Sequence, residues 1–334
     1  MSKKLYVDFH IIQTVPPSCL NRDDTNSPKT AIYGGVRRAR VSSQAWKKAT
    51  RDMFDGRGIR TKNVVDVIAE KLDGDMKLAE KIITSAGISL KDKQSKALFL
   101  LSDAQASALA EVAKSGSFDK KEAQLALNSS PSIDIALFGR MLADDPKLNI
   151  DAACQVAHAI STHKVDTEFD FFTAIDDRSP GDNAGAGMMG TIEYNSATLY
   201  RYATIAAHDL QKLLGGSGEN TAKAVCEFAD AFTRSMPTGK QNTFANRTLP
   251  DYVLITLRED QPVNLAGAFE SPVKSNDGYA SRSVQQLVKY ADEVYSKWCE
   301  KPLADDTYIV GETGSLKEIL EKIEKDVLKK IEEA

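Results

Sequence analysis

The sequence is poor in the residues on which disulfide, redox and zinc chemistry depend. Its 334 residues include four cysteines and four histidines, and no two cysteines form a C-x-x-C pair. The cysteines lie far apart, which favours reduced thiols in a cytoplasmic protein. They are Cys19, Cys154, Cys226 and Cys299. No apolar run reaches the roughly 18 residues of a membrane span. No signal-peptide pattern is found either, so we expect no membrane contact.

Signatures of common enzyme classes are also missing. The sequence contains no G-x-S-x-G or H-E-x-x-H motif and no convincing Ser-His-Asp order. His158 and His163 are five residues apart in a segment with a helical pattern, so they would face different sides of a helix. No cysteine or carboxylate completes a metal site with them. We therefore expect no metal and no cofactor, and interpret these histidines, with His10 and His208, as core or helix-surface residues.

A glycine tract at residues 185–190 matches the dinucleotide-binding pattern G-x-G-x-x-G. That fingerprint requires a helix directly after the glycines, whereas this tract runs into the strand-like segment TIEYNSATLYRY. We therefore expect a flexible hairpin tip that exposes Met188 and Met189. Exposed apolar side chains on such a tip suit wedging between stacked bases.

The composition is that of an ordinary globular protein, with 42% hydrophobic residues, 27% charged residues and a formal net charge of −4. The length allows one large domain with insertions or two moderate domains. The hydrophobic pattern predicts an α+β fold that opens with a strand at residues 5–14, ended by Pro16 and Pro17. Further strands are expected on both sides of the glycine tract, within 169–177 and at 197–205, and again at 252–257.

Helical patterns dominate residues 56–163 and predict a helical insertion. Its short helices are expected at 63–72, 77–85, 104–113, 120–127, 135–142 and 151–162. Longer helices are expected at 219–235 and 283–299. A last helix starts with the capping box formed by Ser315 and Glu318. The apolar stripe of this last helix favours docking on the body of the protein over docking on a partner.

The most unusual stretch runs from Ser18 to Arg51, because it has no acidic residue between Asp24 and Asp52. It carries Lys29, Arg37, Arg38, Arg40, Lys47, Lys48 and Arg51. A local basic surplus inside a slightly acidic protein favours a positioned anion site. The alternative is a solvated charged face, which is the usual origin of a charge run.

The basic stretch leads into a helix whose first turn Ser42 or Ser43 can cap. Helical spacing puts Trp46, Ala49 and Met53 on an apolar face, and it puts Gln44, Lys47, Lys48 and Arg51 on another. Free N–H groups at a helix start, flanked by serines and arginines, suit phosphate oxygens.

The adjacent Asp23 and Asp24 admit two interpretations. A loop carboxylate could hold magnesium for phosphodiester cleavage. The alternative, which we favour, is that the pair orients Arg22 or Arg37 through ion pairing.

Several motifs together resemble a known family. They are SCLNRDD (18–24), G-G-x-R-R-x-R-x-S-S-Q (34–44), DIALFGRM (134–141), AHAISTH-x-VD (157–166) and the FFTA-x-DD and YRYA pair (171–177 and 200–203). In order and over nearly the whole chain, they resemble the crRNA-binding backbone subunit of the type I-E CRISPR Cascade complex, a CasC-type member of the RAMP superfamily.

The resemblance implies a hand-like α+β fold. An RRM-like (ferredoxin-like) palm would comprise residues 1–55 and 164–334, and helical fingers residues 56–163. A β-hairpin thumb would comprise residues 177–196, and a web loop residues 236–247. The implied role is non-catalytic and cytoplasmic. Copies stack head to tail in a filament along the guide RNA (crRNA), each thumb kinks the RNA, and the free bases pair with target DNA. Implied partners are the large, small, tail and crRNA-processing Cascade subunits.

The resemblance also implies which residues contact RNA. Phosphate contacts would fall on Arg22, Lys29, Ser42, Gln44, Lys47, Lys48 and Arg51, and Arg37, Arg38, Arg40 and Ser43 of the same basic run join the expected RNA-binding set. Apolar contacts at the kink would come from Met141, Phe171, Phe172 and Met189, and web contacts from Lys240 and Gln241. Related RAMP subunits of other CRISPR types cleave target RNA with a loop aspartate, so Mg-dependent cleavage through Asp23 or Asp24 is the alternative function.

Overall fold

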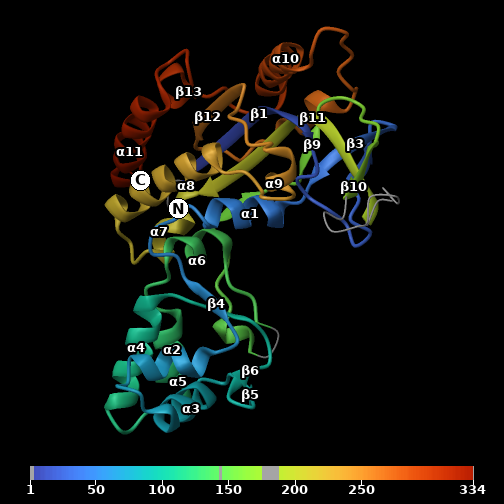
Figure 1. Cartoon of the computed structure of the whole chain (residues 1–334). Coiled ribbons are helices and arrows are strands. Elements are labelled where there is room, and N and C mark those ends of the chain that lie inside the picture. The colour runs from blue at the N-terminus through green and yellow to red at the C-terminus, as the bar shows by residue number, and fades with distance from the viewer. Residues whose placement is uncertain (1–3, 143–144, 175–187, 334) are drawn as a thin grey trace, which may run out of the picture.

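The computed structural model describes residues 4–142, 145–174 and 188–333. It shows a mixed α+β protein in two parts, which Figure 1 separates clearly. The upper part is built on a large antiparallel sheet flanked by helices and is called the body below. The lower part, residues 59–128 and 140–148, is mainly helical and is called the helical lobe.

The two longest strands, β1 (Tyr6–Ser18) and β11 (Met188–Ala206), pair antiparallel at the centre of the sheet. The strand order is β13-β12-β1-β11-β9-β3-β2, and β8 and β10 also pair with β11. The other strands are β2 (Thr30–Tyr33), β3 (Val36–Val41), β8 (Cys154–Val156), β9 (Ala159–Ser161), β10 (Glu168–Ala174), β12 (Tyr252–Arg258) and β13 (Thr307–Ile309).

Strand β1 continues past Pro16 and Pro17, so the prediction that these prolines end it is wrong. The register against β11 shifts between Val15 and Ser18, where the β1 side has one residue more than its partner. A bulge of this kind leaves positions without a ladder hydrogen bond, and a proline lacks the N–H that such a bond needs. The strand therefore tolerates the two prolines there.

Both faces of the sheet are covered, as the alternation along β1 shows. Val7, Phe9 and Ile11 face one core, to which α8 and α11 contribute. Ile12 faces a second core, to which α10 contributes. The helices of the body are α1 (Ser43–Arg51), α6 (Ile133–Phe138), α7 (Ala207–Leu213), α8 (Gly218–Arg234), α9 (Gln241–Phe244), α10 (Ala280–Trp298) and α11 (Leu316–Glu332), with the 3-10 turns η2 (Leu265–Phe269) and η3 (Ala304–Asp306).

The last helix, α11, confirms its sequence prediction. Ser315 and Glu318 form the reciprocal capping box. Ile319, Ile323 and Val327 are buried in the core shared with α8, so the apolar stripe docks within the chain.

The helical lobe has its own core, which includes the fully buried Ile68, Ile82 and Leu109. Its elements are α2 (Val64–Glu70), α3 (Met76–Ser85), α4 (Asp103–Lys114), α5 (Lys120–Asn128), η1 (Pro146–Leu148) and two small ribbons, β4 (Ile59–Thr61) with β7 (Phe99–Leu101) and β5 (Leu90–Lys91) with β6 (Gln94–Ser95). The helices predicted from 63 to 127 are confirmed. The helix predicted at 135–142 begins at Ile133 and ends at Phe138, before Gly139, whose φ is +76°.

The prediction of a helix at 151–162 is wrong. This segment forms β8 and β9, which pair with β11 in the main sheet. The hydrogen bonds offered by β11 outweigh the helical preference of a short alanine-containing stretch. Residues 154–156 and 159–161 therefore belong to the main sheet and not to the helical lobe.

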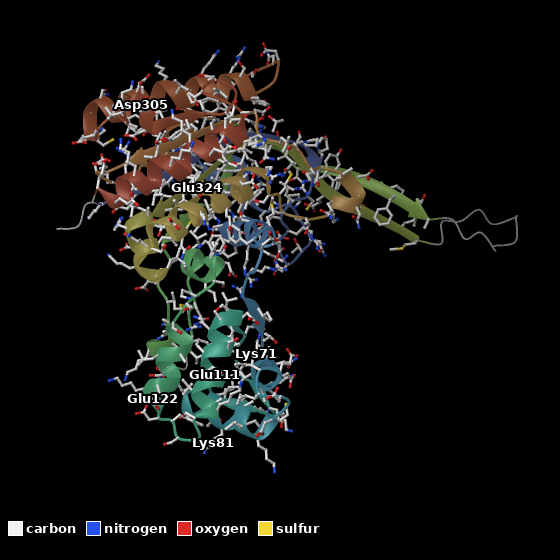
Figure 2. The ribbon with its side chains drawn as sticks, turned by 90° about the vertical axis from the view of Figure 1, so that its left-hand side faces the viewer. Lys71, Lys81, Glu111, Glu122, Asp305 and Glu324 are labelled. Carbon is white, nitrogen blue, oxygen red and sulfur yellow. The ribbon has the colours of Figure 1, made fainter. Side chains whose placement is uncertain are left out.

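Strand β10 and the first residues of β11 form a two-stranded arm, called the long hairpin below. Its register runs from Glu168 opposite Tyr194 to Ala174 opposite Met188. Figure 2 shows the arm projecting away from the body. Its first strand begins at Glu168, earlier than the thumb range 177–196 that the family resemblance implies. The glycine tract up to residue 187 lies outside the described residues, and the chain continues as strand from Met188.

Candidate nucleic-acid interface

The basic stretch folds into the β2–β3 hairpin followed directly by α1. Gly34 and Gly35 make the turn, with φ of +57° and +75°. The turn lies tightly against the loop after η2, because a Cβ on Gly34 would lie 1.6 Å from the Glu270 carbonyl oxygen. Strand β3 joins the main sheet through β9, with Arg40 opposite Ile160. The cations from Arg37 onward are therefore fixed on β3 and α1, whereas Arg22 and Lys29 lie in the loop before β2.

The start of α1 confirms Ser42 as the N-cap, since its side chain accepts a hydrogen bond from the Ala45 N–H. Two neighbouring amides already have partners within the chain. The Ser42 N–H donates to Asn21 Oδ1 at 2.9 Å, and the Ser43 N–H donates to His158 Nδ1 at 3.0 Å. The prediction of free amides at this helix start is thus wrong for both serines, and an anion there would be held mainly by side chains.

Most of the expected cations lie at the surface. Arg22 and Arg37 are exposed, and Lys29, Arg40 and Lys47 are half-buried. Arg22 donates to Asn26 Oδ1 at 2.9 Å, and Arg40 Nε donates to the Thr30 carbonyl at 3.4 Å. Lys47 Nζ lies 5.8 Å from the centre of the Phe138 ring. Lys48 pairs with Asp52 at 2.6 Å, with its side chain 73% exposed, and Gln44 beside it is exposed.

Two of the expected cations point inward. Arg38 is fully buried and donates to the carbonyls of Ser161, Phe269 and Glu270 at 2.9, 2.8 and 3.3 Å. Arg51 donates to Asp134 Oδ2 at 2.5 Å and also to the Gly58 carbonyl. Their guanidinium groups bind acceptors within the protein, so neither is available to an external anion.

The loop at residues 236–247 lies beside this surface. Gly239 packs on the segment after β1, since a Cβ there would lie 2.2 Å from the Leu20 carbonyl oxygen. Burial raises the pKa of the Cys19 thiol, and the positive charges of Lys240 and Arg22 oppose that rise, which places both cations near Cys19. Lys240 has a left-handed backbone with φ of +44°, and the neighbouring Gln241 is exposed.

The same loop contacts the base of the long hairpin. The Phe244 ring lies 5.8 Å from the ring of Tyr194 on β11. Three chain segments far apart in sequence thus meet: residues 18–29, the 236–247 loop and β11. The expected web residues and basic residues are brought together by the fold.

The apolar residues on the long hairpin divide between its two faces. The register pairs Phe171 with Thr191 and Met189 with Thr173, so Phe171 and Met189 share a face with Phe169. Their exposed fractions are 63%, 66% and 66%. Phe172 lies on the other face, opposite Gly190. Phe169 was missed, although the alternation of β10 predicts that it shares a face with Phe171.

Met141 is the most exposed of the expected apolar contacts, at 89%. Its neighbour Arg140 is buried in the helical lobe and donates to the carbonyls of Leu148 and Leu127, both at 2.9 Å. This anchoring of Arg140 fixes the backbone that presents Met141 to solvent.

Asp23 stabilises its own loop through hydrogen bonds. Its Oδ1 accepts hydrogen bonds from the Thr25 hydroxyl, the Thr25 N–H and the Ser27 N–H at 2.7, 2.9 and 3.0 Å. The bond from the Thr25 hydroxyl is the main cause of the lowered pKa of Asp23. The expected ion pairing of Asp23 and Asp24 with Arg22 or Arg37 is not found among the described residues, and Arg22 donates to Asn26 instead.

Within the described parts of the chain, no three histidine, cysteine or carboxylate side chains gather as a metal site would require. Across those same ranges, none of the helices is both long and apolar enough to cross a membrane.

The architecture defines the class of protein to which the chain belongs. It matches a solved chain of a "CRISPR RNA-guided surveillance complex, pre-nicking" with a TM-score of 0.82 and 31% identity, covering 96% of this chain and 100% of that one. A chain of another "CRISPR RNA-guided surveillance complex" matches with a TM-score of 0.64 and 31% identity, over 97% of this chain and 99% of that one. The fold is that of a surveillance-complex subunit.

The family is also defined. The model of the CT1975-like protein family matches residues 7–333, so the chain belongs to this family. No curated protein matches the chain in sequence. The resemblance to subunits of a CRISPR surveillance complex, recognised from motifs, is thereby confirmed.

Proposed function

We propose that this protein is a non-catalytic backbone subunit that holds guide RNA in a CRISPR surveillance complex. The observation that carries the proposal is the convergence of cations from distant segments at the base of the long hairpin. Arg22 and Lys29 come from the loop after β1, Arg40 from β3 and Lys240 from the 236–247 loop. Together they form a surface suited to a chain of phosphates, and we call these four residues the basic surface.

The finer features follow from the family resemblance and stay part of the proposal. The body would be the RRM-like palm, the helical lobe the fingers and the long hairpin the thumb of a type I-E Cascade backbone subunit in the cytoplasm. Copies would stack head to tail along the crRNA beside the other Cascade subunits. A head-to-tail contact that does not close into a ring generates a filament.

The long hairpin would supply the distortion of the RNA. Its exposed face of Phe169, Phe171 and Met189 can take the place of a base in a stack, which offsets the cost of unstacking. Bases between kinks would stay free to pair with target DNA, so the sequence is read by pairing and not by the protein.

The test is the salt dependence of RNA binding by the full-length chain. Each phosphate contact to a single strand contributes about 0.7 to the slope of log K against log salt. We expect the triple variant Lys29→Ala, Arg40→Ala and Lys240→Ala to lower that slope by about two. Lys317→Ala, an exposed lysine on α11, is the matched control and should leave it unchanged. An unchanged slope in the triple variant contradicts the proposed surface.

Cleavage through Asp23 is tested separately. Guide paired with labelled target RNA should stay intact in magnesium; regularly spaced cuts that Asp23→Ala abolishes would overturn the non-catalytic role.

A further inference from the structure

His158 lies between β8 and β9, next to the start of α1. Its Nδ1 accepts a hydrogen bond from the Ser43 N–H at 3.0 Å, and its side chain is exposed. From sequence it was interpreted as a core or helix-surface residue, because a helix was expected there. Its position depends on the pairing of β8 and β9 with β11.

The contact with Ser43 determines the protonation state of the ring. A nitrogen that accepts from an N–H carries no proton, so the proton of the neutral imidazole is on Nε2. Nε2 lies across the ring from Nδ1 and therefore points away from Ser43. The side chain thus offers one N–H donor.

Charges around the ring keep it neutral. Partial burial, together with the positive charges of Arg40 on β3 and Lys29 on the loop before β2, lowers the pKa of His158. The ring also has a geometric reason to stay neutral, since protonated Nδ1 would face the Ser43 N–H with a second donor. His158 is therefore an uncharged donor beside two cations of the basic surface.

We propose that His158 is a phosphate ligand of the basic surface, with Nε2–H donating to a phosphate oxygen whose charge Arg40 and Lys29 neutralise. This inference rests on the proposed RNA-binding function and adds a residue to it. The ligand class is a phosphodiester oxygen, because an N–H donor near two cations is complementary to an anionic acceptor.

A neutral ligand has a distinctive signature. It strengthens binding through a hydrogen bond but displaces no counterion, so its loss weakens binding without changing the salt slope. A charged ligand such as Lys29 changes both. The two kinds of contact can therefore be told apart in one titration series.

The experiment measures binding of fluorescent oligouridylate to the full-length chain over a range of KCl concentrations. His158→Phe keeps an aromatic ring without the N–H, and we expect it to raise Kd about tenfold at every salt concentration. Lys29→Ala should lower the slope by about 0.7. His158→Gln, which can accept from Ser43 and donate to phosphate, should restore most of the affinity.

A purely structural role for His158 is tested by two further readouts. The matched control is His208→Phe on α7, because His208 Nδ1 also accepts from a backbone amide, the Leu5 N–H, at 3.2 Å. This variant should leave Kd unchanged. In nitrogen-15 spectra of the imidazoles, free His158 should show the Nε2–H form, and RNA should shift the Nε2 resonance. A resonance that RNA does not move overturns the proposal.

Failure of this inference can be distinguished from failure of the proposed function. If the wild-type chain binds RNA with a steep salt dependence and His158→Phe binds equally well, only the role of His158 is overturned. If His158→Phe lowers the salt slope as Lys29→Ala does, the ring acts as a cation and the neutral-donor proposal is wrong. If the wild-type chain shows no salt-dependent binding, the RNA-binding function itself is contradicted.

Discussion

At the scale of single residues, the sheet buries ionisable groups that are not part of the proposed basic surface. Asp8 on β1 is fully buried and accepts hydrogen bonds from the Tyr202 hydroxyl at 3.1 Å and the Val263 N–H at 2.8 Å. Burial raises its pKa to about 6. On the same face, burial lowers the pKa of His10 to about 3, and His10 Nδ1 lies 2.9 Å from the Tyr200 hydroxyl. Asp8 should therefore give stability a measurable pH dependence.

We predict that Asp8→Asn removes this dependence. The folded-state pKa of about 6 lies above the ordinary 3.8, so the folded protein holds the Asp8 proton more tightly than the unfolded chain does. This stabilisation is fully present below the unfolded pKa and is lost as pH rises through about 6. The difference in free energy of unfolding between wild type and Asp8→Asn should fall by about 3 kcal/mol as pH rises from 3.8 to about 6. Urea unfolding at a series of pH values measures it, and a constant difference contradicts the burial argument.

The sequence identified which residues are basic but not which of them face solvent. Arg37 and Arg38 are neighbours, yet strand alternation exposes the first and buries the second. Arg51 points inward because Asp134, 83 positions later, lies beside it in the fold. Partners so distant in the chain leave no local pattern, so burial of a cation could not be predicted from the stretch itself.

At the scale of elements, the Arg51–Asp134 pair joins α1 of the body to α6 and to the segment that enters the helical lobe. Asp134 is fully buried, with its side chain accepting from the Gly58 N–H at 2.9 Å and the Ser132 hydroxyl at 2.6 Å as well as from Arg51. Three chain segments thus converge on one carboxylate where the two parts of the molecule meet.

We predict that Asp134→Ala lowers the free energy of unfolding by about 3 kcal/mol, because it leaves the Arg51 charge largely buried without its partner. Asp103→Ala is the matched control: Asp103 pairs with Lys71 at 2.6 Å, but its side chain is 80% exposed. Its loss should cost less than about 1 kcal/mol. Denaturant unfolding measures both losses. Equal losses would contradict the argument that the buried Arg51–Asp134 pair stabilises the protein more than an exposed pair does.

The long hairpin gives a second prediction for an element. Phe171→Ala combined with Met189→Ala should leave Tm unchanged, since both side chains are mostly exposed. RNA affinity should fall about tenfold, because the stacking surface is lost. Leu125→Ala on α5, where Leu125 is 62% exposed, controls for loss of an exposed apolar side chain. Wild-type affinity in the double variant would mean that this face of the hairpin does not contact RNA.

Prediction of elements from sequence succeeded where a periodic pattern was long. α8, α10 and α11 each run for 17 residues or more and were located within a few residues of their ends. β8 and β9 have three residues each, and β2 has four. Such short strands form because a partner strand is already in place, and the sequence does not display that partner.

At the scale of the whole molecule, the body and the helical lobe have separate cores and are joined by few chain crossings. The body contains the sheet and its flanking helices, and the helical lobe packs around its own buried residues. The long hairpin and the helical lobe project from the body in different directions (Figure 2). The apolar side chains on the exposed face of the hairpin are mostly outside the core, so they can be substituted without loss of the fold.

The most direct test of the proposed function is to identify the nucleic acid that the protein carries. The chain would be expressed with a CRISPR array and its companion subunits, purified, and the bound nucleic acid extracted and sized. We predict guide RNA of uniform length. Its yield should be lower with the triple variant of Lys29, Arg40 and Lys240 than with wild type, and should be unchanged with Lys317→Ala. RNA of mixed length, or none, would contradict a guide-binding backbone role and leave the basic surface as a solvated charged face.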